Sequence, residues 1–338
     1  MTRLDHTRHR RSRRDLLRAG AVAGIVLGVR SGDLRAAAGA QGGDALRTVA
    51  SFSILADWVA NVGGEHIALS TIVPAGGDAH TFDPDPSQVA SIGDARLIFA
   101  IGAGFEPWLA DMIDASGSDA VLVEVSRGLA LLDGAAHEDE HADEEDHGHD
   151  GAQDEHDHAG ADPHIWGDVA NAIAAVETIR AALAEADPAH ADAYRANADA
   201  YVAALDELDA WIRERVRTIP EERRKLVTSH DTLRYYAHAY GFEILGTALG
   251  SQSTEAGDPA AGEIAALVAA IEEAGVPAIF AENVANPDLM RAIAEEAGVE
   301  LAPPLLTDAL GEEGSRGDTY IGMMRANTET IVAALGGA

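Results

Sequence analysis

Short apolar runs alternate with amphipathic stretches along the chain from residue 46 onward. The strands predicted in the first part of the chain are residues 46–51, 66–73, 96–101 and 120–125. Segments with a helical pattern, such as 87–92 and 106–115, lie between them. Strands that alternate with helices are typical of units in which helices cover a parallel sheet. The pattern therefore predicts an α/β lobe.

A second alternating unit follows a long helical region that extends from residue 168 to 217. Asp187-Pro188 interrupts this region, and proline is favoured at the first position of a helix. A helix over 188–217 would span about 45 Å at the standard rise per residue, which suggests a connecting strut. The strands predicted beyond it are residues 225–229, 242–246 and 278–281, and a final helix is expected at 319–335. We therefore predict two α/β lobes, 46–187 and 219–338, joined by one long linker helix at 188–218.

The first forty residues have the pattern of a signal peptide. Arg13 and Arg14 precede an apolar stretch at 19–29, and small residues at 36–40 offer cleavage sites. The paired arginines resemble a twin-arginine export signal, although the general export pathway remains an alternative. The apolar stretch is shorter than the ~20 residues that span a bilayer, so we expect cleavage rather than a membrane anchor. Cysteine is absent, which excludes disulfides, thiolate metal sites and a lipid attached at an N-terminal cysteine.

Residues 137–158 interrupt the α/β pattern. This segment of 22 residues contains six histidines, eleven acidic residues and no large apolar side chain. It cannot bury enough surface to offset the entropy lost on ordering, so we expect a mobile surface loop. Its role is either that of a solvated spacer or that of a low-affinity zinc antenna. The histidines that would bind zinc weakly are His137, His141, His147, His149, His156 and His158.

The charge of the chain bears on its possible partners. The formal net charge is −33 at pH 7. Nucleic-acid binding requires clustered lysine and arginine, so a nucleic-acid partner is not expected. A strongly negative protein attracts cations instead.

Without cysteine, a transition-metal site must be built from imidazole and carboxylate groups. His80, His164 and His230 stand in predicted loops, where ligands bind in open α/β sheets, and Asp318 opens the final helix. Each residue also has a structural explanation, since a histidine after a strand can be solvated and Asp318 can cap its helix. The four together could surround one ion between the lobes.

At these residues the chain resembles the metal-binding solute-binding proteins of ABC importers for zinc and manganese, the cluster A-I or cluster 9 group. The motifs that carry the resemblance, in order along residues 46–336, are Gly77-Asp78-Ala79-His80-Thr81-Phe82-Asp83-Pro84, Asp162-Pro163-His164-Ile165-Trp166, Val227-Thr228-Ser229-His230-Asp231, Val276-Pro277-Ala278-Ile279-Phe280-Ala281-Glu282-Asn283 and Gly317-Asp318-Thr319-Tyr320. The resemblance implies two (β/α)4 lobes, a rigid linking helix and a metal ion in the cleft. It also implies delivery of that ion to a membrane permease driven by an ATPase.

The ligands implied by the resemblance are His80, His164, His230 and Asp318. Manganese-type members commonly have glutamate at the third position, and three imidazoles with one carboxylate favour Zn²⁺ over Mn²⁺. Glu282 and Asp231 are candidates to orient the ligands from outside. The acidic histidine-rich loop also resembles that of zinc-type members.

These observations predict an exported, monomeric zinc-capturing protein that is periplasmic or otherwise extracytoplasmic and has no stable insertion in the membrane. The alternatives are the manganese-binding component of the same importer class and a periplasmic zinc buffer or metallochaperone. A zinc hydrolase with three histidine ligands is disfavoured, because His80, His164 and His230 are far apart in the sequence. The H-E-x-x-H match at 137–141 lies in the acidic segment predicted to be a loop, whereas this motif binds zinc from a helix. An enzymatic activity is therefore not expected.

Overall fold

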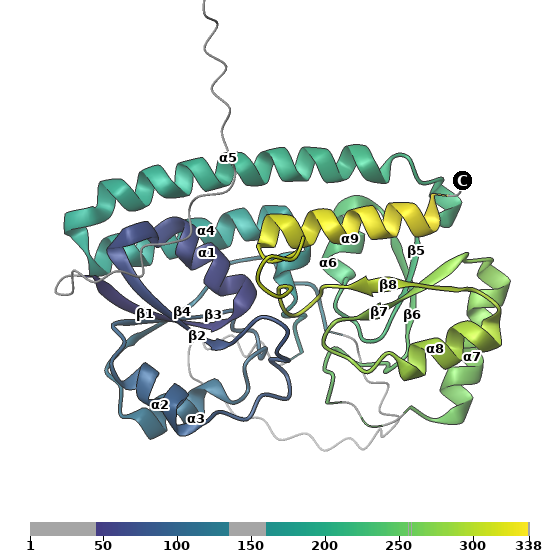
Figure 1. Ribbon diagram of the computed structural model, residues 1–338, viewed down its shortest axis with the longest axis horizontal. Coiled ribbons are helices and arrows are strands. Elements are labelled where there is room, and N and C mark those ends of the chain that lie inside the picture. Colours follow the sequence, from purple (N-terminus) through teal and green to yellow (C-terminus); the bar gives the residue numbers. More distant parts are fainter. Residues whose placement is uncertain (1–44, 135–159, 256, 258, 337–338) are drawn as a thin grey trace, which may run out of the picture. The chain divides into compact units, whose positions relative to one another are not determined.

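The computed structural model describes residues 45–134, 160–255, 257 and 259–336. The predicted signal peptide at 1–40 and the histidine-rich segment 137–158 lie outside these residues. The described residues have the predicted α/β architecture, with parallel strands, covering helices and one long helix (Figure 1).

The N-terminal lobe is built on one parallel sheet with the strand order β2-β1-β3-β4. Its strands are β1 (Leu46–Phe52), β2 (Ile67–Val73), β3 (Leu97–Ala100) and β4 (Val121–Glu124). Its helices are α1 (Ser53–Gly63), α2 (Pro86–Gly93) and α3 (Leu109–Ser116), and a 3-10 turn, η1 (Gly64–His66), precedes β2. All four residues of the inner strand β3 are buried, which explains why it is a continuous apolar run in the sequence.

The C-terminal lobe contains two parallel strand pairs, β5-β6 and β7-β8. The strands are β5 (Lys225–Thr228), β6 (Glu243–Thr247), β7 (Ala278–Glu282) and β8 (Glu300–Leu305). The helices are α6 (Arg234–Tyr240), α7 (Ala261–Ala274) and α8 (Asp288–Ala297). β5 and β7 lie side by side, which brings the two pairs together.

Strand β8 is absent from the prediction because two prolines interrupt its apolar pattern. Pro303 and Pro304 lack backbone N–H groups and are tolerated in sheets at edges and irregularities. β8 pairs with β7, and the pairing register shifts between Phe280 and Glu282, opposite the prolines. β8 is therefore an irregular edge strand that tolerates two prolines, although prolines in a sequence usually indicate that no strand is present.

Two long helices come next along the chain: α4 (Val169–Ala186), which belongs to the first lobe, and α5 (Ala191–Val216). The break at Asp187-Pro188 is where the sequence predicts it, but Pro188 opens a 3-10 turn, η3 (Pro188–His190), before α5 begins. The 26 residues of α5 extend over about 39 Å. This helix contacts α1 and α4 of one lobe and α6 and α9 of the other, as expected of a linker (Figure 1).

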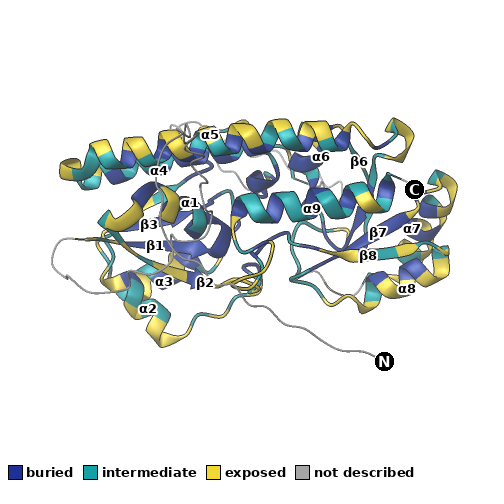
Figure 2. Ribbon diagram, turned by 45° about the horizontal axis from the view of Figure 1, so that its top comes forward, coloured by how far each residue is buried: buried dark blue, intermediate teal, exposed yellow. Residues whose placement is uncertain are grey.

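The sequence of α5 explains why one of its faces is buried and the other exposed (Figure 2). Its buried residues recur every three or four positions, which is the repeat of one helix face. They are Tyr194, Ala198, Tyr201, Leu205, Leu208, Ile212 and Val216. The last helix, α9 (Tyr320–Leu335), packs against α5, α1 and β8. Among the described residues, no helix combines the length and apolar character needed to cross a membrane.

Candidate metal centre

Three histidines and one aspartate from four separate loops converge at a buried point between the two lobes. They are His80, His164, His230 and Asp308, and each offers a ligand atom within 4.8 Å of the others. His80 follows β2, His230 follows β5, Asp308 follows β8, and His164 precedes a 3-10 turn, η2 (Ile165–Gly167). His164, His230 and Asp308 are fully buried, whereas His80 retains 7% exposure. His80 is therefore the member of this cluster that is nearest to solvent.

The distances show that the Nε2 atoms of the histidines face one carboxylate oxygen. Asp308 Oδ2 lies 2.8 Å from His230 Nε2 and 3.3 Å from His80 Nε2. His164 Nε2 lies 3.4 Å from His80 Nε2. Three imidazole nitrogens and one carboxylate oxygen so close together form a donor set that suits a tetrahedral transition-metal ion.

Two of the imidazoles are oriented by carboxylates on their opposite side. Asp162 Oδ1 lies 2.8 Å from His164 Nδ1, and Glu282 Oε2 lies 2.5 Å from His230 Nδ1. A proton held on Nδ1 by a carboxylate leaves Nε2 free of a proton and able to bind a metal. Glu282 thus lies against His230, as the orienting role predicted for it from the sequence requires. Asp231, the other candidate, lies beside Arg234 instead, with Oδ2 3.7 Å from Nε.

Glu282 also fixes the backbone that carries His230. Its Oε1 accepts hydrogen bonds from the N–H groups of Ser229 (2.8 Å) and His230 (3.0 Å). Its Oε2 accepts one from Thr307 Oγ1 at 3.1 Å, next to Asp308 in the sequence. One buried carboxylate therefore holds segments on both sides of the cluster.

The charged forms of His230 and Asp308 are favoured although both side chains are buried. Burial lowers the pKa of His230, but the carboxylates of Glu282 and Asp308 outweigh this and hold that pKa well above its ordinary value. Burial raises the pKa of Asp308, but His230 and its other histidine neighbours hold it well below the usual range. The carboxylate of Asp308 therefore favours its charged form and can compensate the charge of a bound cation.

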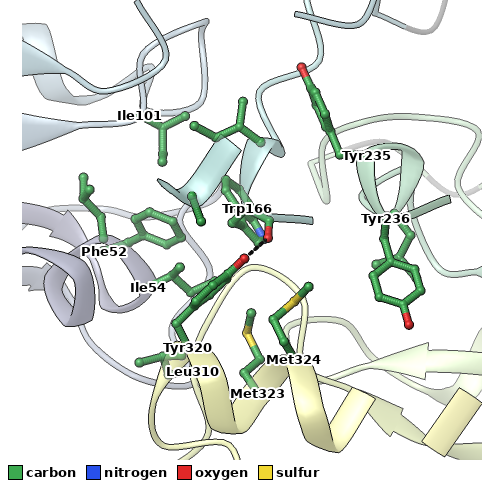
Figure 3. Packing of buried hydrophobic residues seen from close by; sticks show 14 of the residues in the cluster. Phe52, Ile54, Ile101, Trp166, Tyr235, Tyr236, Leu310, Tyr320, Met323 and Met324 are labelled. Carbon is green, nitrogen blue, oxygen red and sulfur yellow. Dashed lines mark hydrogen bonds between the residues drawn. The ribbon is translucent and has the colours of Figure 1, made fainter. Parts of the chain in front are cut away.

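The packing behind the cluster connects the loops of the two lobes. Trp166, two residues after His164, donates from Nε1 to the carbonyl of Thr307 at 2.8 Å. The hydroxyl of Tyr320, the first residue of α9, donates to the carbonyl of Trp166 at 2.7 Å (Figure 3). The Trp166 ring packs on Phe52 with a centroid separation of 5.2 Å. His164 and Asp308 are therefore attached to one common body of packed side chains.

The fourth predicted ligand, Asp318, does not join this cluster, and Asp308 occupies the corresponding place. Asp318 Oδ2 accepts a hydrogen bond from the N–H of Gly314 at 3.0 Å, in the turn before α9. Sequence reasoning missed Asp308 because the two prolines interrupt the strand pattern of β8, so the loop that follows β8 was not recognised as the end of a strand. An apolar run over residues 301–306 followed by Thr307-Asp308 is the available signal. The six histidines predicted as auxiliary ligands belong to 137–158, outside the described residues.

The chain is similar to several known proteins. Residues 48–334 match the family described as ZnuA, zinc-uptake complex component A, periplasmic. The manganese-binding lipoprotein MntA of Halalkalibacterium halodurans is 38% identical over 293 residues, which cover 87% of this chain and 89% of the relative. The zinc-binding protein TroA of Treponema pallidum is 30% identical over 292 residues, 85% of this chain and 88% of that protein.

A solved structure supports the same fold. The periplasmic zinc-binding protein TroA from Treponema pallidum superposes with a TM-score of 0.74 at 28% identity, covering 86% of this chain and 99% of that one. The Mn-bound periplasmic metal-binding protein from Candidatus Liberibacter asiaticus has a TM-score of 0.73 at 22% identity, which bears on the fold alone. The predicted two-lobe α/β fold is confirmed.

Proposed function

Because this chain belongs to the ZnuA family of metal-binding solute-binding proteins of ABC importers, we propose that the ion it captures is Zn²⁺. The observation that carries this proposal is the donor set of three imidazole nitrogens and one carboxylate oxygen. Zn²⁺ is commonly bound by four such ligands in a tetrahedral arrangement, with no geometric preference of its own to satisfy. Binding rather than catalysis fits a complete set of four ligands, because a catalytic zinc site keeps one position open for water.

Manganese is the second candidate, and one observation favours it. The relative that is 38% identical is named as a manganese-binding protein, although another relative is named as zinc-binding. Mn²⁺ is better suited to carboxylate, carbonyl and water ligands in octahedral geometry. The buried cluster, with three nitrogens to one carboxylate, is the physical argument for Zn²⁺ over Mn²⁺.

Capture and release follow from the charges around the cluster. Asp308 supplies one negative charge directly, and Asp162 and Glu282 supply two more through the imidazoles that they orient. These carboxylates compensate the divalent ion while the imidazoles remain neutral. Protons compete for the same nitrogens, so affinity falls as the pH drops, and the fall begins above the ordinary histidine range because the pKa of His230 is raised. The loaded protein then delivers its ion to the membrane permease of the importer.

The place of action that we propose is outside the cytoplasm, with the protein monomeric and not attached to a lipid. The MntA relative is named as a lipoprotein, whereas this chain has no cysteine for attachment of a lipid. Cleavage of the signal peptide at 1–40 would release the remaining chain. The segment 137–158 would act as a low-affinity zinc antenna. A periplasmic zinc buffer without a permease is the competing role of the protein.

The test is native mass spectrometry with competition titration, in which Zn²⁺ and Mn²⁺ are offered together to residues 41–338. We expect one tightly bound zinc ion, which is lost in His230→Ala and kept when 137–158 is deleted. Tight manganese in place of zinc would assign the second candidate. Zinc bound only when 137–158 is present would refute the cluster as the capture site.

A further inference from the structure

The two carboxylate oxygens of Asp308 have different surroundings. Oδ2 faces the ligand nitrogens, at 2.8 Å from His230 Nε2 and 3.3 Å from His80 Nε2. Oδ1 accepts a hydrogen bond from the hydroxyl of Thr232 at 2.9 Å. Asp308 and Thr232 are both buried, so this bond is protected from competition with water.

Thr232 is held in place by its own backbone and side chain. Its N–H donates to the carbonyl of His230 at 3.1 Å, within the loop between β5 and α6. A β-branched side chain has few accessible χ1 rotamers, so its hydroxyl is directed with little freedom. The neighbouring buried hydroxyl of Thr307 is directed to Glu282 instead. The loop that carries one ligand thus also orients the carboxylate of another.

The orientation of a carboxylate decides how many ligand atoms it supplies. A carboxylate that binds through one oxygen completes a four-coordinate site with three imidazoles, whereas binding through both oxygens raises the coordination number to five. Zn²⁺ is satisfied by four ligands, and Mn²⁺ is suited to more oxygen ligands in octahedral geometry. A hydrogen bond to a charged oxygen contributes more than one between neutral groups, so Oδ1 is not readily released to a metal.

We propose that Thr232 is a specificity-determining residue of the metal centre. Its hydroxyl holds Oδ1 of Asp308 away from the ion, restricts that carboxylate to one ligand oxygen and thereby favours Zn²⁺ over Mn²⁺. This inference rests on the proposed function, since it assigns a source to the selectivity of the same site.

The test uses Co²⁺ as a spectroscopic probe in residues 41–338. Tetrahedral Co²⁺ absorbs visible light much more strongly than five- or six-coordinate Co²⁺, so the spectrum reports the coordination number. We expect a strong tetrahedral spectrum in the unaltered protein and in Thr232→Ser, which keeps the hydroxyl. Thr232→Val, which is similar in size but cannot donate, should weaken the spectrum and lower the ratio of Zn²⁺ to Mn²⁺ affinity roughly tenfold.

Thr328→Val is the matched control, because Thr328 is equally buried but its hydroxyl donates to the carbonyl of Met324 in α9. It should change neither the spectrum nor the affinity ratio. Circular dichroism establishes that each variant is folded, and Thr232→Ala replaces the valine variant if the latter is not. The inference is overturned if the valine or alanine variant keeps the tetrahedral spectrum and the affinity ratio, or if the unaltered protein already binds Co²⁺ with five or six ligands.

Failure of this inference differs from failure of the proposed function. An unaltered protein that prefers Mn²⁺ to Zn²⁺ contradicts zinc capture, whatever the spectra of the variants. An unaltered protein that prefers Zn²⁺ and is insensitive to Thr232→Val keeps zinc capture and removes Thr232 as its source of selectivity.

Discussion

Replacement of Glu282 by glutamine tests how buried His230, one of the proposed ligands, is prepared for a metal ion. Glu282 Oε2 lies 2.5 Å from His230 Nδ1, so the carboxylate holds a proton on Nδ1 and leaves Nε2 able to bind. Glutamine keeps the shape, and its remaining oxygen can still accept from the N–H groups of Ser229 and His230. Its amide N–H₂, however, then faces Nδ1 as a donor. His230 must respond by moving its proton to Nε2, where it blocks the metal.

The size of the effect follows from this geometry. Loss of a carboxylate that orients a metal-binding histidine costs roughly 10–100-fold in affinity, which corresponds to about 1.4–2.7 kcal/mol. The metal-free protein should lose some stability in Glu282→Gln, because the Glu282 carboxylate is one of the groups that raise the pKa of buried His230, although the buried backbone donors keep their acceptor. Glu282→Ala should also destabilise the fold, since it leaves those donors unpaired at about 1–3 kcal/mol each.

The assay is a competition titration of Zn²⁺ against a chelator, together with thermal unfolding of the metal-free protein. Glu106→Gln is a matched control, because Glu106 is also a buried glutamate that accepts from two backbone N–H groups, those of Ile101 and Gly102. It orients no histidine of the cluster and should leave zinc affinity unchanged. Our reasoning fails if Glu282→Gln binds zinc as tightly as the unaltered protein, or if both glutamine variants lose affinity equally.

Three further predictions concern other parts of the protein. Asp308→Ala should abolish tight zinc binding in a competition titration, whereas Asp318→Ala should retain it; the reverse result would restore Asp318 as the ligand. Burial raises the pKa of Glu106 from 4.5 to about 7, so the folded state keeps a proton that the unfolded state has lost. Stability should therefore fall as the pH rises from 4.5 through 7, and Glu106→Gln should remove up to roughly 3 kcal/mol of that fall in denaturant unfolding of the metal-free protein. An unchanged pH slope would contradict the assignment. Thr254 Oγ1 donates to Asp78 Oδ2 at 2.6 Å, which connects the His80 loop to the other lobe. Thr254→Val should accelerate zinc dissociation several-fold in stopped-flow chelation, and an unaltered rate would show that this contact does not retain the ion.

The sequence alone determined the α/β architecture and indicated the three histidines that the structure brings into one cluster. Apolar runs of strand length indicate buried strands, because an inner parallel strand such as β3 must be apolar on both faces. His80 and His230 were recognisable because each follows such a run, where the chain leaves the sheet. The break between α4 and α5 was visible for a similarly local reason, since proline cannot continue a helix. Asp162, two residues before His164, is a partner within the same motif.

Only the tertiary structure decided which carboxylate completes the cluster and which groups orient it. The prolines of β8 violate the local pattern of a strand, and the strand exists because β7 pairs with it at a shifted register. That pairing places Asp308 beside His230, 78 residues earlier in the chain. Glu282 and Thr232 acquire their roles in the same way, from side chains that meet across the ends of separate strands. Local sequence patterns indicate which residues are buried. Which distant carboxylates, hydroxyls and imidazoles come into contact depends on how the strands pair and how the lobes pack.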